Sequence, residues 1–280
     1  MCYNTHMRSA TVKINAKINL SLNVVGKEDG YHMLDSVAAS VDIADVITVY
    51  ESKSPVAKFS NRDIDAEKSN AFAAAMFLTK KYSLPPVGVV VENNIPAGTG
   101  LGGSSADCAG VILAIKKAFL PNMTDEEIFL TAQMFGSDTP YMLRGGFARL
   151  NGRGEKIRRI NSCLKCAVAI AYKDKILTKK CFDEFDRLRL LGTVADNDRL
   201  IDCLVRSDAK GVFSAAANAL APAAARLNPF VAEMLSADDG VAKCMTGSGS
   251  GIVLFGADGE YLDALRRSGV NVICTEIVPK

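Results

Sequence analysis

The sequence has no tryptophan, only two histidines and no long apolar run. A membrane-spanning helix requires about 20 consecutive apolar residues, so no membrane partner is expected. The first ten residues, MCYNTHMRSA, lack the apolar core of a signal peptide, and a cytoplasmic location is therefore expected. Because His6 and His32 are the only imidazoles, a site built from several histidines is excluded.

An excess of charge of one sign is also missing, because 33 basic residues are balanced by 31 acidic ones. Without a broad positive field, nucleic acid is disfavoured as a partner. The eight cysteines are scattered along the chain and are expected to stay reduced. Cys163 and Cys166 have the spacing of a metal or redox pair, but no second pair lies at zinc-site distance, so no metal site is expected.

Length and composition are those of a globular enzyme, with 280 residues of which 49% are hydrophobic and 23% charged. Such a chain can bury a sizeable core in one large domain or in two of roughly 140 residues each. We expect two domains with a boundary near Asn161. The domains are then residues 1–160 and 161–280.

Glycine is most concentrated between Gly98 and Gly103, where four of six residues are glycine. Ser104 and Ser105 follow, and apolar residues then recur at helical spacing until Pro121. A glycine loop that leads into a helix presents free backbone N–H groups and the positive end of the helix dipole. The segment is therefore a candidate phosphate-binding loop.

Other glycine loops fit this segment less well. A Walker loop requires a lysine after the glycines, and none is present. The dinucleotide pattern GxGxxG matches Gly98, Gly100 and Gly103, but Ile95-Pro96 interrupts the strand that should precede it, and the ribose-binding acid expected about 20 residues later is missing. A purely structural glycine loop before a core helix is the remaining alternative.

Residues 12–23 alternate strictly between apolar and polar side chains, which predicts a strand with one buried face. The other face carries Lys13, Asn15, Lys17, Asn19, Ser21 and Asn23. These residues either line a polar cleft or belong to an exposed edge strand that lysine protects from aggregation. Asp29-Gly30 then indicates a turn. Tyr31 and His32, which follow it, could contact a planar ligand or pack within their own loop.

The remaining patterns predict a mixture of helices and strands. Ser69 is expected to cap a helix over 71–82, and Thr124 to open a capping box on a helix ending near 135. Residues 53–67 and 151–159 read as turns, the second with a solvated basic face of Arg153, Lys156, Arg158 and Arg159. Strands are expected over 37–50, 87–91, 145–150, 165–172, 241–245, 252–255 and 270–278. Further helices are expected over 179–188, 197–207, 210–220, 229–236 and 260–268.

Two more segments could carry chemistry. Asp138 lies in residues 136–141, which interrupt the helical pattern. An acid at such a place is either a turn former or a catalytic group. Residues 246–251, TGSGSG, form a second glycine-rich turn. This turn is either a simple connection or a partner that meets the first glycine loop across a cleft to share a polyphosphate.

The segments AKINLSL, PAGTGLGGSSA, GSDTPYML and TGSGSG, in this order and spacing, resemble the GHMP kinase superfamily over nearly the whole chain. The resemblance implies an α+β, two-domain architecture, with an N-terminal domain like the second domain of ribosomal protein S5 and a ferredoxin-like C-terminal domain. With KINLSLNVVGKEDGYH included, the chain is similar to the branch that phosphorylates a hydroxyl of a cytidine diphosphate-linked methylerythritol in non-mevalonate isoprenoid biosynthesis. A kinase of the mevalonate, phosphomevalonate or homoserine type is the first alternative, and a catalytically inactive S5-like binding module is the second.

The resemblance also implies roles for individual residues. Asp138 matches the catalytic base and Lys17 its electrostatic partner. Asn19, Tyr31 and His32 match the substrate side, with Tyr31 and His32 facing the cytosine and Phe182 as a second aromatic residue over that ring. The implied ATP loop consists of Pro96, Ala97, Gly98, Thr99, Gly100, Leu101, Gly102, Gly103, Ser104, Ser105 and Ala106. A further loop on the phosphate side consists of Gly247, Ser248 and Gly249.

ATP is the implied cosubstrate, with Mg²⁺ carried by it, and the implied partner is a small molecule bound by a monomer or homodimer. Three features depart from the family pattern. Relatives usually have three glycines before two serines where this chain has Gly102 to Ala106. Met33 follows His32 where an acid is frequent, and no obvious second carboxylate for magnesium appears on the helix after the loop.

Overall fold

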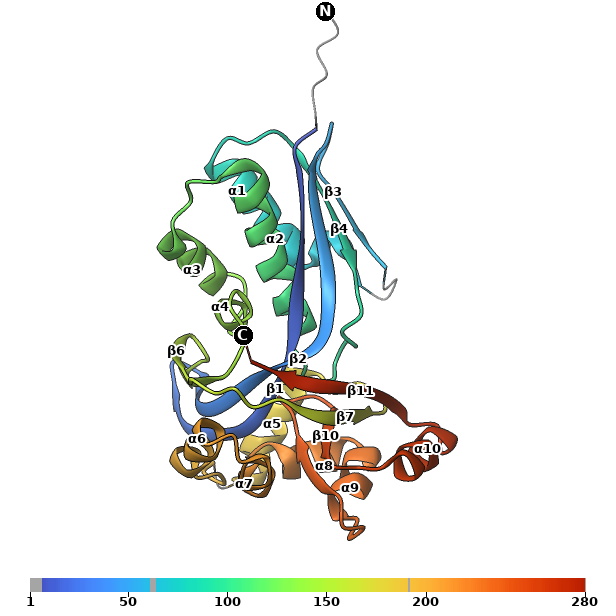
Figure 1. The fold of residues 1–280 in the computed structure, drawn as a ribbon. Helices are drawn as coiled ribbons and strands as arrows, with labels where there is room; N and C mark the ends of the chain where they lie inside the picture. The colour runs from blue at the N-terminus through green and yellow to red at the C-terminus, as the bar shows by residue number, and fades with distance from the viewer. Residues whose placement is uncertain (1–6, 61–63, 191, 280) are drawn as a thin grey trace, which may run out of the picture. The chain divides into compact units, whose positions relative to one another are not determined.

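The computed structural model describes residues 7–60, 64–190 and 192–279. They form two compact units that are interleaved along the chain (Figure 1). The first unit takes the described residues of Met1–Ala16, Ile43–Ile95 and Gly102–Arg144, and the second those of Lys17–Asp42, Pro96–Leu101 and Gly145–Lys280. The domains expected from the sequence, 1–160 and 161–280, are continuous instead, and that division stays a prediction.

Two long strands run through both units. They are β1 (Ser9–Glu28) and β2 (Tyr31–Glu51). Asp29 and Gly30 connect them with φ angles of +49° and +79°, which is the backbone of a tight hairpin turn. The turn expected at Asp29-Gly30 is therefore confirmed. The strand expected over 12–23 is confirmed and longer at both ends.

In the first unit, two helices pack together beside a small sheet (Figure 1). β2 pairs antiparallel with β4 (Val87–Glu92), and β4 pairs in parallel with β3 (Val56–Phe59). Gly110 permits the close approach of a helix to this sheet, because a side chain there would collide with Ile47 of β2. The helices of the unit are η1 (Ala66–Lys68), α1 (Asn70–Lys81), α2 (Gly103–Phe119), α3 (Asp125–Gln133) and α4 (Thr139–Met142).

The second unit is built on antiparallel strands in the order β2-β11-β7-β10-β9. β5 pairs with both β2 and β6, and β8 pairs in parallel with β1. The strands are β5 (Ala148–Gly152), β6 (Lys156–Arg159), β7 (Cys166–Tyr172), β8 (Ala217–Asn218), β9 (Ala242–Met245), β10 (Ile252–Phe255) and β11 (Asn271–Val278). The helices are α5 (Thr178–Leu188), α6 (Asn197–Val205), α7 (Ala209–Ala215), α8 (Ala221–Leu227), α9 (Pro229–Ser236) and α10 (Gly259–Arg267).

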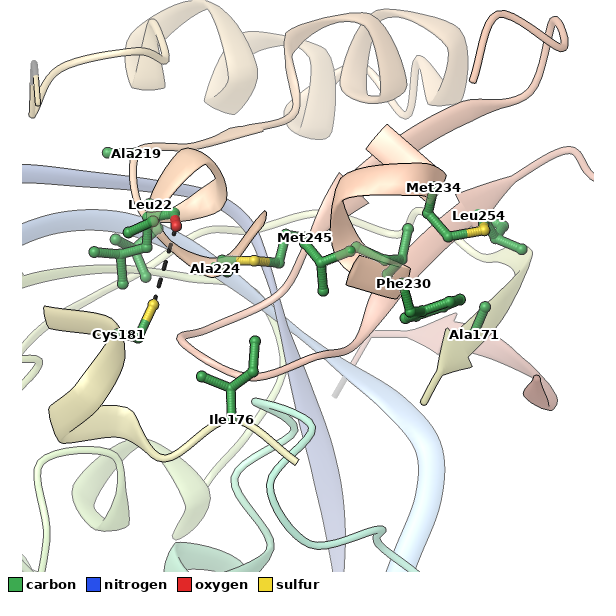
Figure 2. Close-up of a cluster of buried hydrophobic side chains, with 14 of the residues drawn as sticks. Leu22, Ala171, Ile176, Cys181, Ala219, Ala224, Phe230, Met234, Met245 and Leu254 are labelled. Carbon is green, nitrogen blue, oxygen red and sulfur yellow. Dashed lines mark hydrogen bonds between the residues drawn. The ribbon is translucent and has the colours of Figure 1, made fainter. Parts of the chain in front are cut away.

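Apolar side chains from several of these elements form the core of the second unit (Figure 2). Leu254 of β10 and Met245 of β9 pack with Phe230 and Met234 of α9, while Leu22 of β1 and Cys181 of α5 lie at the other end of the cluster. All six side chains are less than one tenth exposed. The core thus joins β1, the strands of the sheet and helices α5, α8 and α9 into one body.

The two helix starts expected from the sequence are confirmed. Ser69 Oγ accepts the backbone N–H of Phe72 at 3.1 Å at the start of α1. Thr124 and Glu127 form the reciprocal capping box at the start of α3. No helix within the described ranges combines the length and the apolar character needed to cross a membrane.

Three local expectations are wrong. Residues 56–59 and 156–159, both expected in turns, form strands β3 and β6. The helix expected over 210–220 ends at Ala215, because residues 217–218 extend and pair with Ser21 and Leu22 of β1. In that alanine-rich stretch, pairing with a distant strand outweighs the intrinsic helix propensity. A separate helix, α8, then follows.

Candidate active site

The two glycine-rich segments of the chain are in direct contact within the second unit. The backbone N–H of Gly251 donates to Thr99 O at 3.1 Å, and that of Ser250 donates to Gly98 O at 3.3 Å. Ser250 Oγ donates in turn to Asp174 O at 2.6 Å. Residues 246–251 therefore support the segment Pro96–Leu101 by packing on its backbone, and no cleft separates the two at these positions.

This contact requires glycine on both sides. A side chain at Gly100 would collide with Thr246 O, and one at Gly249 would collide with the backbone of residues 98–100. Gly98 and Gly100 also have φ angles of +76° and +83°, where residues with a Cβ atom are strained. The glycine spacing thus serves backbone-to-backbone packing that holds the loop in one shape.

The second half of the candidate ATP loop belongs to the first unit and opens α2. Gly102, with a φ of +80°, is the N-cap and provides no side chain to cap the helix. Its carbonyl oxygen accepts the backbone N–H groups of Ser105 and Ala106 at 3.1 and 2.9 Å. Ser104 is exposed and Ser105 half-buried. The beginning of a 17-residue helix therefore lies at an accessible surface, where its dipole favours an anion.

The turn that carries Asp138 lies beside this helix start. A side chain on Gly136 would stand 3.4 Å from Ser105 Oγ and 2.8 Å from Thr139 Oγ1. Asp138 occupies the N-cap position of α4 but its carboxylate does not cap that helix. Asp138 is half-buried, and its turn lies near the candidate phosphate site.

Lys17 is held beside the same loop, in the second unit. Its backbone N–H donates to Leu101 O at 3.0 Å, and its Nζ donates to Asn19 Oδ1 at 2.6 Å. Lys17 and Asn19 are both 4% exposed. The ammonium group is thus fixed by the strand next to the glycine segment. Because Lys17 and Asp138 belong to different units, their action as a pair stays a prediction.

The polar face of β1 is buried from Lys17 onward, so the edge-strand interpretation is wrong for that part. Asn19 donates to Ser36 Oγ at 2.7 Å, and its backbone N–H donates to Thr246 Oγ1 at 2.9 Å. Ser21 Oγ donates to Asn197 Oδ1, and Asn23 Oδ1 accepts the N–H groups of residues 194 and 195. Hydrogen bonds satisfy these polar groups inside the protein, and they anchor β1 to β2 and α6.

A cluster of aromatic and charged residues surrounds His32. Its ring stacks on Phe182 with centroids 4.6 Å apart and planes inclined by 25°, and meets Phe185 edge-on at 6.1 Å. His32 Nε2 lies 2.7 Å from Asp186 Oδ1, and Lys27 Nζ lies 2.6 Å from the other oxygen of Asp186. Hydrogen bonds from His32 and Lys27 lower the pKa of Asp186. The carboxylate therefore stays ionised and fixes the imidazole ring.

Tyr31 lies in a different environment from His32. Its side chain is 55% exposed, and the guanidinium of Arg153 lies 3.7 Å from the ring centroid. Adjacent residues of a strand point to opposite faces, which accounts for the separation. The structure thus joins His32 to Phe182, as the expected shared role requires, while Tyr31 contacts Arg153 instead.

Sequence reasoning overlooked Phe185 and Asp186 and treated Arg153 as part of a solvated face. The first two follow Phe182 at spacings of three and four residues on α5, which places all three on one side of a helix. That spacing was a usable signal. No such signal pointed to Arg153. Its contact with the Tyr31 ring depends on the hairpin of β5 and β6, and that region was expected to be a turn.

A family model described as "GHMP kinases N terminal domain" matches residues 69–146. The chain is 32% identical over 252 residues to the 4-diphosphocytidyl-2-C-methyl-D-erythritol kinase of Bacillus cytotoxicus, which covers 88% of this chain and 86% of the relative. It is 35% identical to the kinase of the same name from Clostridium beijerinckii, where the match spans 64% of that relative's length.

Solved structures show the same fold. A crystal structure of 4-(cytidine 5'-diphospho)-2C-methyl-D-erythritol kinase superposes with a TM-score of 0.77 at 25% identity, covering 97% of this chain and 100% of that one. Homoserine kinase from Cytophaga hutchinsonii superposes with a TM-score of 0.72 at 16% identity, covering 100% of this chain and 97% of that one. The α+β architecture expected from the sequence is therefore confirmed.

Proposed function

Because the chain belongs to the GHMP kinase family, we propose that it transfers the γ-phosphoryl group of ATP to a hydroxyl of 4-diphosphocytidyl-2-C-methyl-D-erythritol. The sequence match at 32% identity across 88% of the chain, to a relative named for this acceptor, supports the assignment. The structural observation that carries it is the glycine segment, braced by residues 246–251, that ends at an accessible helix start.

The phosphates of ATP would bind at the first turn of α2. Backbone N–H groups at a helix start, together with the helix dipole, attract phosphate without a lysine in the loop. Ser104 and Ser105 add hydroxyl groups at an accessible position. Within the described residues, no three acidic, histidine or cysteine side chains gather into a metal site. Mg²⁺ would therefore be held mainly by phosphate oxygens, where it supplies positive charge to the transferring group.

In this proposal Asp138 is the general base and Lys17 its electrostatic partner. Phosphoryl transfer depends mostly on positioning and on stabilisation of charge. Asp138 accepts the proton of the acceptor hydroxyl as the new O–P bond forms and ADP leaves. The buried ammonium of Lys17, already oriented by Asn19, favours the ionised form of the base and offsets negative charge in the transition state.

The acceptor's cytosine would bind at His32 and Phe182. Stacking between planar rings needs a face of an aromatic residue, and Phe182 supplies a ring already aligned with His32. Asp186 fixes the orientation of the imidazole ring of His32. The cytosine would then be recognised by hydrogen bonding and by stacking. Tyr31, whose ring lies against Arg153 on the opposite face of β2, is not assigned to the cytosine in this proposal. The same function fits a cytoplasmic monomer or homodimer.

An acceptor panel tests the substrate assignment. Purified protein is given ATP and Mg²⁺ with 4-diphosphocytidyl-2-C-methyl-D-erythritol, mevalonate, phosphomevalonate or homoserine, and ADP release is measured. We expect turnover with the cytidine-bearing acceptor alone. Turnover with one of the other alcohols, and none with the cytidine compound, would reassign the protein to another branch of the family. Homoserine kinase shares the fold, so this experiment separates the branches where the fold does not.

A further inference from the structure

Two buried aspartates lie behind the candidate nucleotide loop in the first unit. Asp45 on β2 is 0% exposed and Asp107 on α2 is 3% exposed. Asp45 Oδ1 accepts the backbone N–H groups of Asn94 and Ile95 at 2.5 and 2.8 Å. Asp107 Oδ2 accepts the Nδ2–H of Asn93 at 3.3 Å. The two carboxyl groups therefore connect the segment that enters the glycine loop to the helix that leaves it.

The other two carboxyl oxygens point to a direct interaction between the aspartates. Asp45 Oδ2 and Asp107 Oδ1 are both buried, and neither has a hydrogen-bond partner among the described residues. The two carboxyl groups are close enough for each to affect the pKa of the other. Two ionised carboxylates cannot share a dry site, so one must keep a proton. Burial and the neighbouring Asp45 raise the pKa of Asp107. Burial also raises the pKa of Asp45, but Asp45 accepts two backbone N–H groups, from Asn94 and Ile95, which favour its ionised form. We therefore assign the shared proton to Asp107.

The same region is where the two ends of the loop meet. Ile95 is 4% exposed, and a Cβ atom on Gly103 would stand 3.3 Å from Ile95 Cγ2. We call this contact, formed by Asn93–Ile95 and the first residues of α2, the loop neck. Since Asp45 holds one side of the neck and Asp107 lies on the other, the pair fixes the spacing between them.

We propose that Asp45 and Asp107 are positioning residues for the nucleotide, which act together to hold the loop neck so that the first backbone N–H groups of α2 converge on the triphosphate. The inference rests on the proposed kinase function. A binding site loses affinity when its groups move by a fraction of an ångström. A fixed loop neck should therefore strengthen the binding of the triphosphate. Asp107 is also a carboxylate on the loop's helix that the sequence did not single out, and it is buried and hydrogen-bonded to Asn93.

Variants with matched controls test the role of the pair. Asp107→Asn keeps a neutral group that can donate to Asp45 and accept from Asn93. Asp107→Ala removes both contacts. Asp65→Asn is the control, because Asp65 is an exposed acid of the same unit that pairs with Lys68. The affinity for Mg-ATP is measured by calorimetry, and folding is checked by circular dichroism.

We expect Asp107→Asn and Asp65→Asn to bind Mg-ATP within about twofold of the wild type and Asp107→Ala to bind at least about tenfold more weakly while folded. Asn93→Ala provides a second test should Asp107→Ala fail to fold, because Asn93 is only half-buried; we expect it to weaken binding about threefold. Unchanged affinity in whichever of these two variants folds would overturn the inference. A wild type that binds no Mg-ATP would instead refute the proposed function.

Discussion

At the scale of single residues, the site depends on charged groups that other side chains hold in place. Lys17 donates to Asn19, and His32 is paired with Asp186. In both cases a partner residue restricts the rotation of a chemically active group. That group therefore loses less conformational entropy when a ligand binds. Asp186 can be removed without touching the proposed ligand contacts.

Asp186→Asn should weaken binding of the cytidine-bearing acceptor. The amide can still accept a hydrogen bond from His32, but the charge-assisted part of the contact is lost. We expect the KM for the acceptor to rise roughly fivefold with the KM for ATP unchanged. Asp183→Asn is the matched control, since Asp183 is an exposed acid on the same helix that pairs with Lys179. Equal changes in both KM values would show that Asp186 does not act through the acceptor.

Asp107→Asn should change how stability depends on pH. Burial and Asp45 raise the pKa of Asp107 from 3.8 to about 9. The folded protein therefore holds a proton that the unfolded chain releases above pH 4 or so, and the free energy of unfolding falls with rising pH by up to about 1.4 kcal/mol per unit in that window. The contribution of Asp107 to stability is complete below its pKa in the unfolded chain, and it is lost as the pH rises to its pKa in the folded protein.

Urea unfolding at pH 5, 7 and 9 measures this dependence. The stability of Asp107→Asn relative to wild type should increase steadily from pH 5 to pH 9, because asparagine has no proton to lose. Asp65→Asn should show no such trend, since the pKa of Asp65 is lowered by its hydrogen bond with Lys68. A constant difference between Asp107→Asn and wild type at all three values would contradict the assigned protonation state.

At the scale of elements, the glycine-rich segments 96–101 and 246–251 hold each other in place. Each of them occupies the space that a side chain on the other would need. Gly249 faces the backbone of residues 98–100, while Gly259 at the start of α10 has no atom within 4 Å of an added Cβ. Backbone atoms cannot move aside as the tip of a side chain can. Substitution at the first position must therefore displace the loop.

Gly249→Ala should lower the free energy of unfolding by roughly 1–3 kcal/mol and weaken ATP binding, because the methyl group forces the two segments apart. Gly259→Ala should leave both properties nearly unchanged or raise stability slightly, since alanine is favoured over glycine in a helix. Thermal unfolding and nucleotide titration of both variants provide the comparison. Wild-type affinity in Gly249→Ala would indicate that the contact does not shape the loop.

The sequence predicted the elements whose signals are local. Alternation revealed β1, the glycine pattern located the loop before α2, and Ser69 and Thr124 located two helix starts. It could not decide whether the polar face of β1 is buried, since its partners at Ser36 and Asn197 are far along the chain. The sequence left open whether the two glycine segments meet, and the Asp45–Asp107 pair was hidden because its members are also far apart along the chain.

At the scale of the whole molecule, the chain order and the compact units do not coincide. The second unit uses Lys17–Asp42 as well as the C-terminal half. Val41 of β2 pairs with Ile277 of β11, and Ser21 of β1 pairs with Ala217 of β8. Leu22 of β1 lies in the same apolar core as helices α5 and α9. The C-terminal half therefore depends on strands from the N-terminal half.

A fragment of residues 161–280 should consequently fail to fold by itself. It would lack β2 on one side of β11 and β1 beside β8, and it would expose apolar side chains that β1 covers. Circular dichroism of the isolated fragment should show no cooperative unfolding transition, whereas the full chain should show one. A cooperative transition in the fragment would support the continuous division at residue 160 expected from the sequence.

Transfer of phosphate in one reaction mixture tests the central claim most directly. Wild-type protein and Asp138→Asn are each mixed with Mg-ATP and 4-diphosphocytidyl-2-C-methyl-D-erythritol, and phosphorus NMR follows the products. We predict that the wild type forms ADP and a new phosphomonoester, and that folded Asp138→Asn binds Mg-ATP but forms the ester at least about a hundredfold more slowly. Absence of the ester with wild type, or an unchanged rate with Asp138→Asn, would contradict the account.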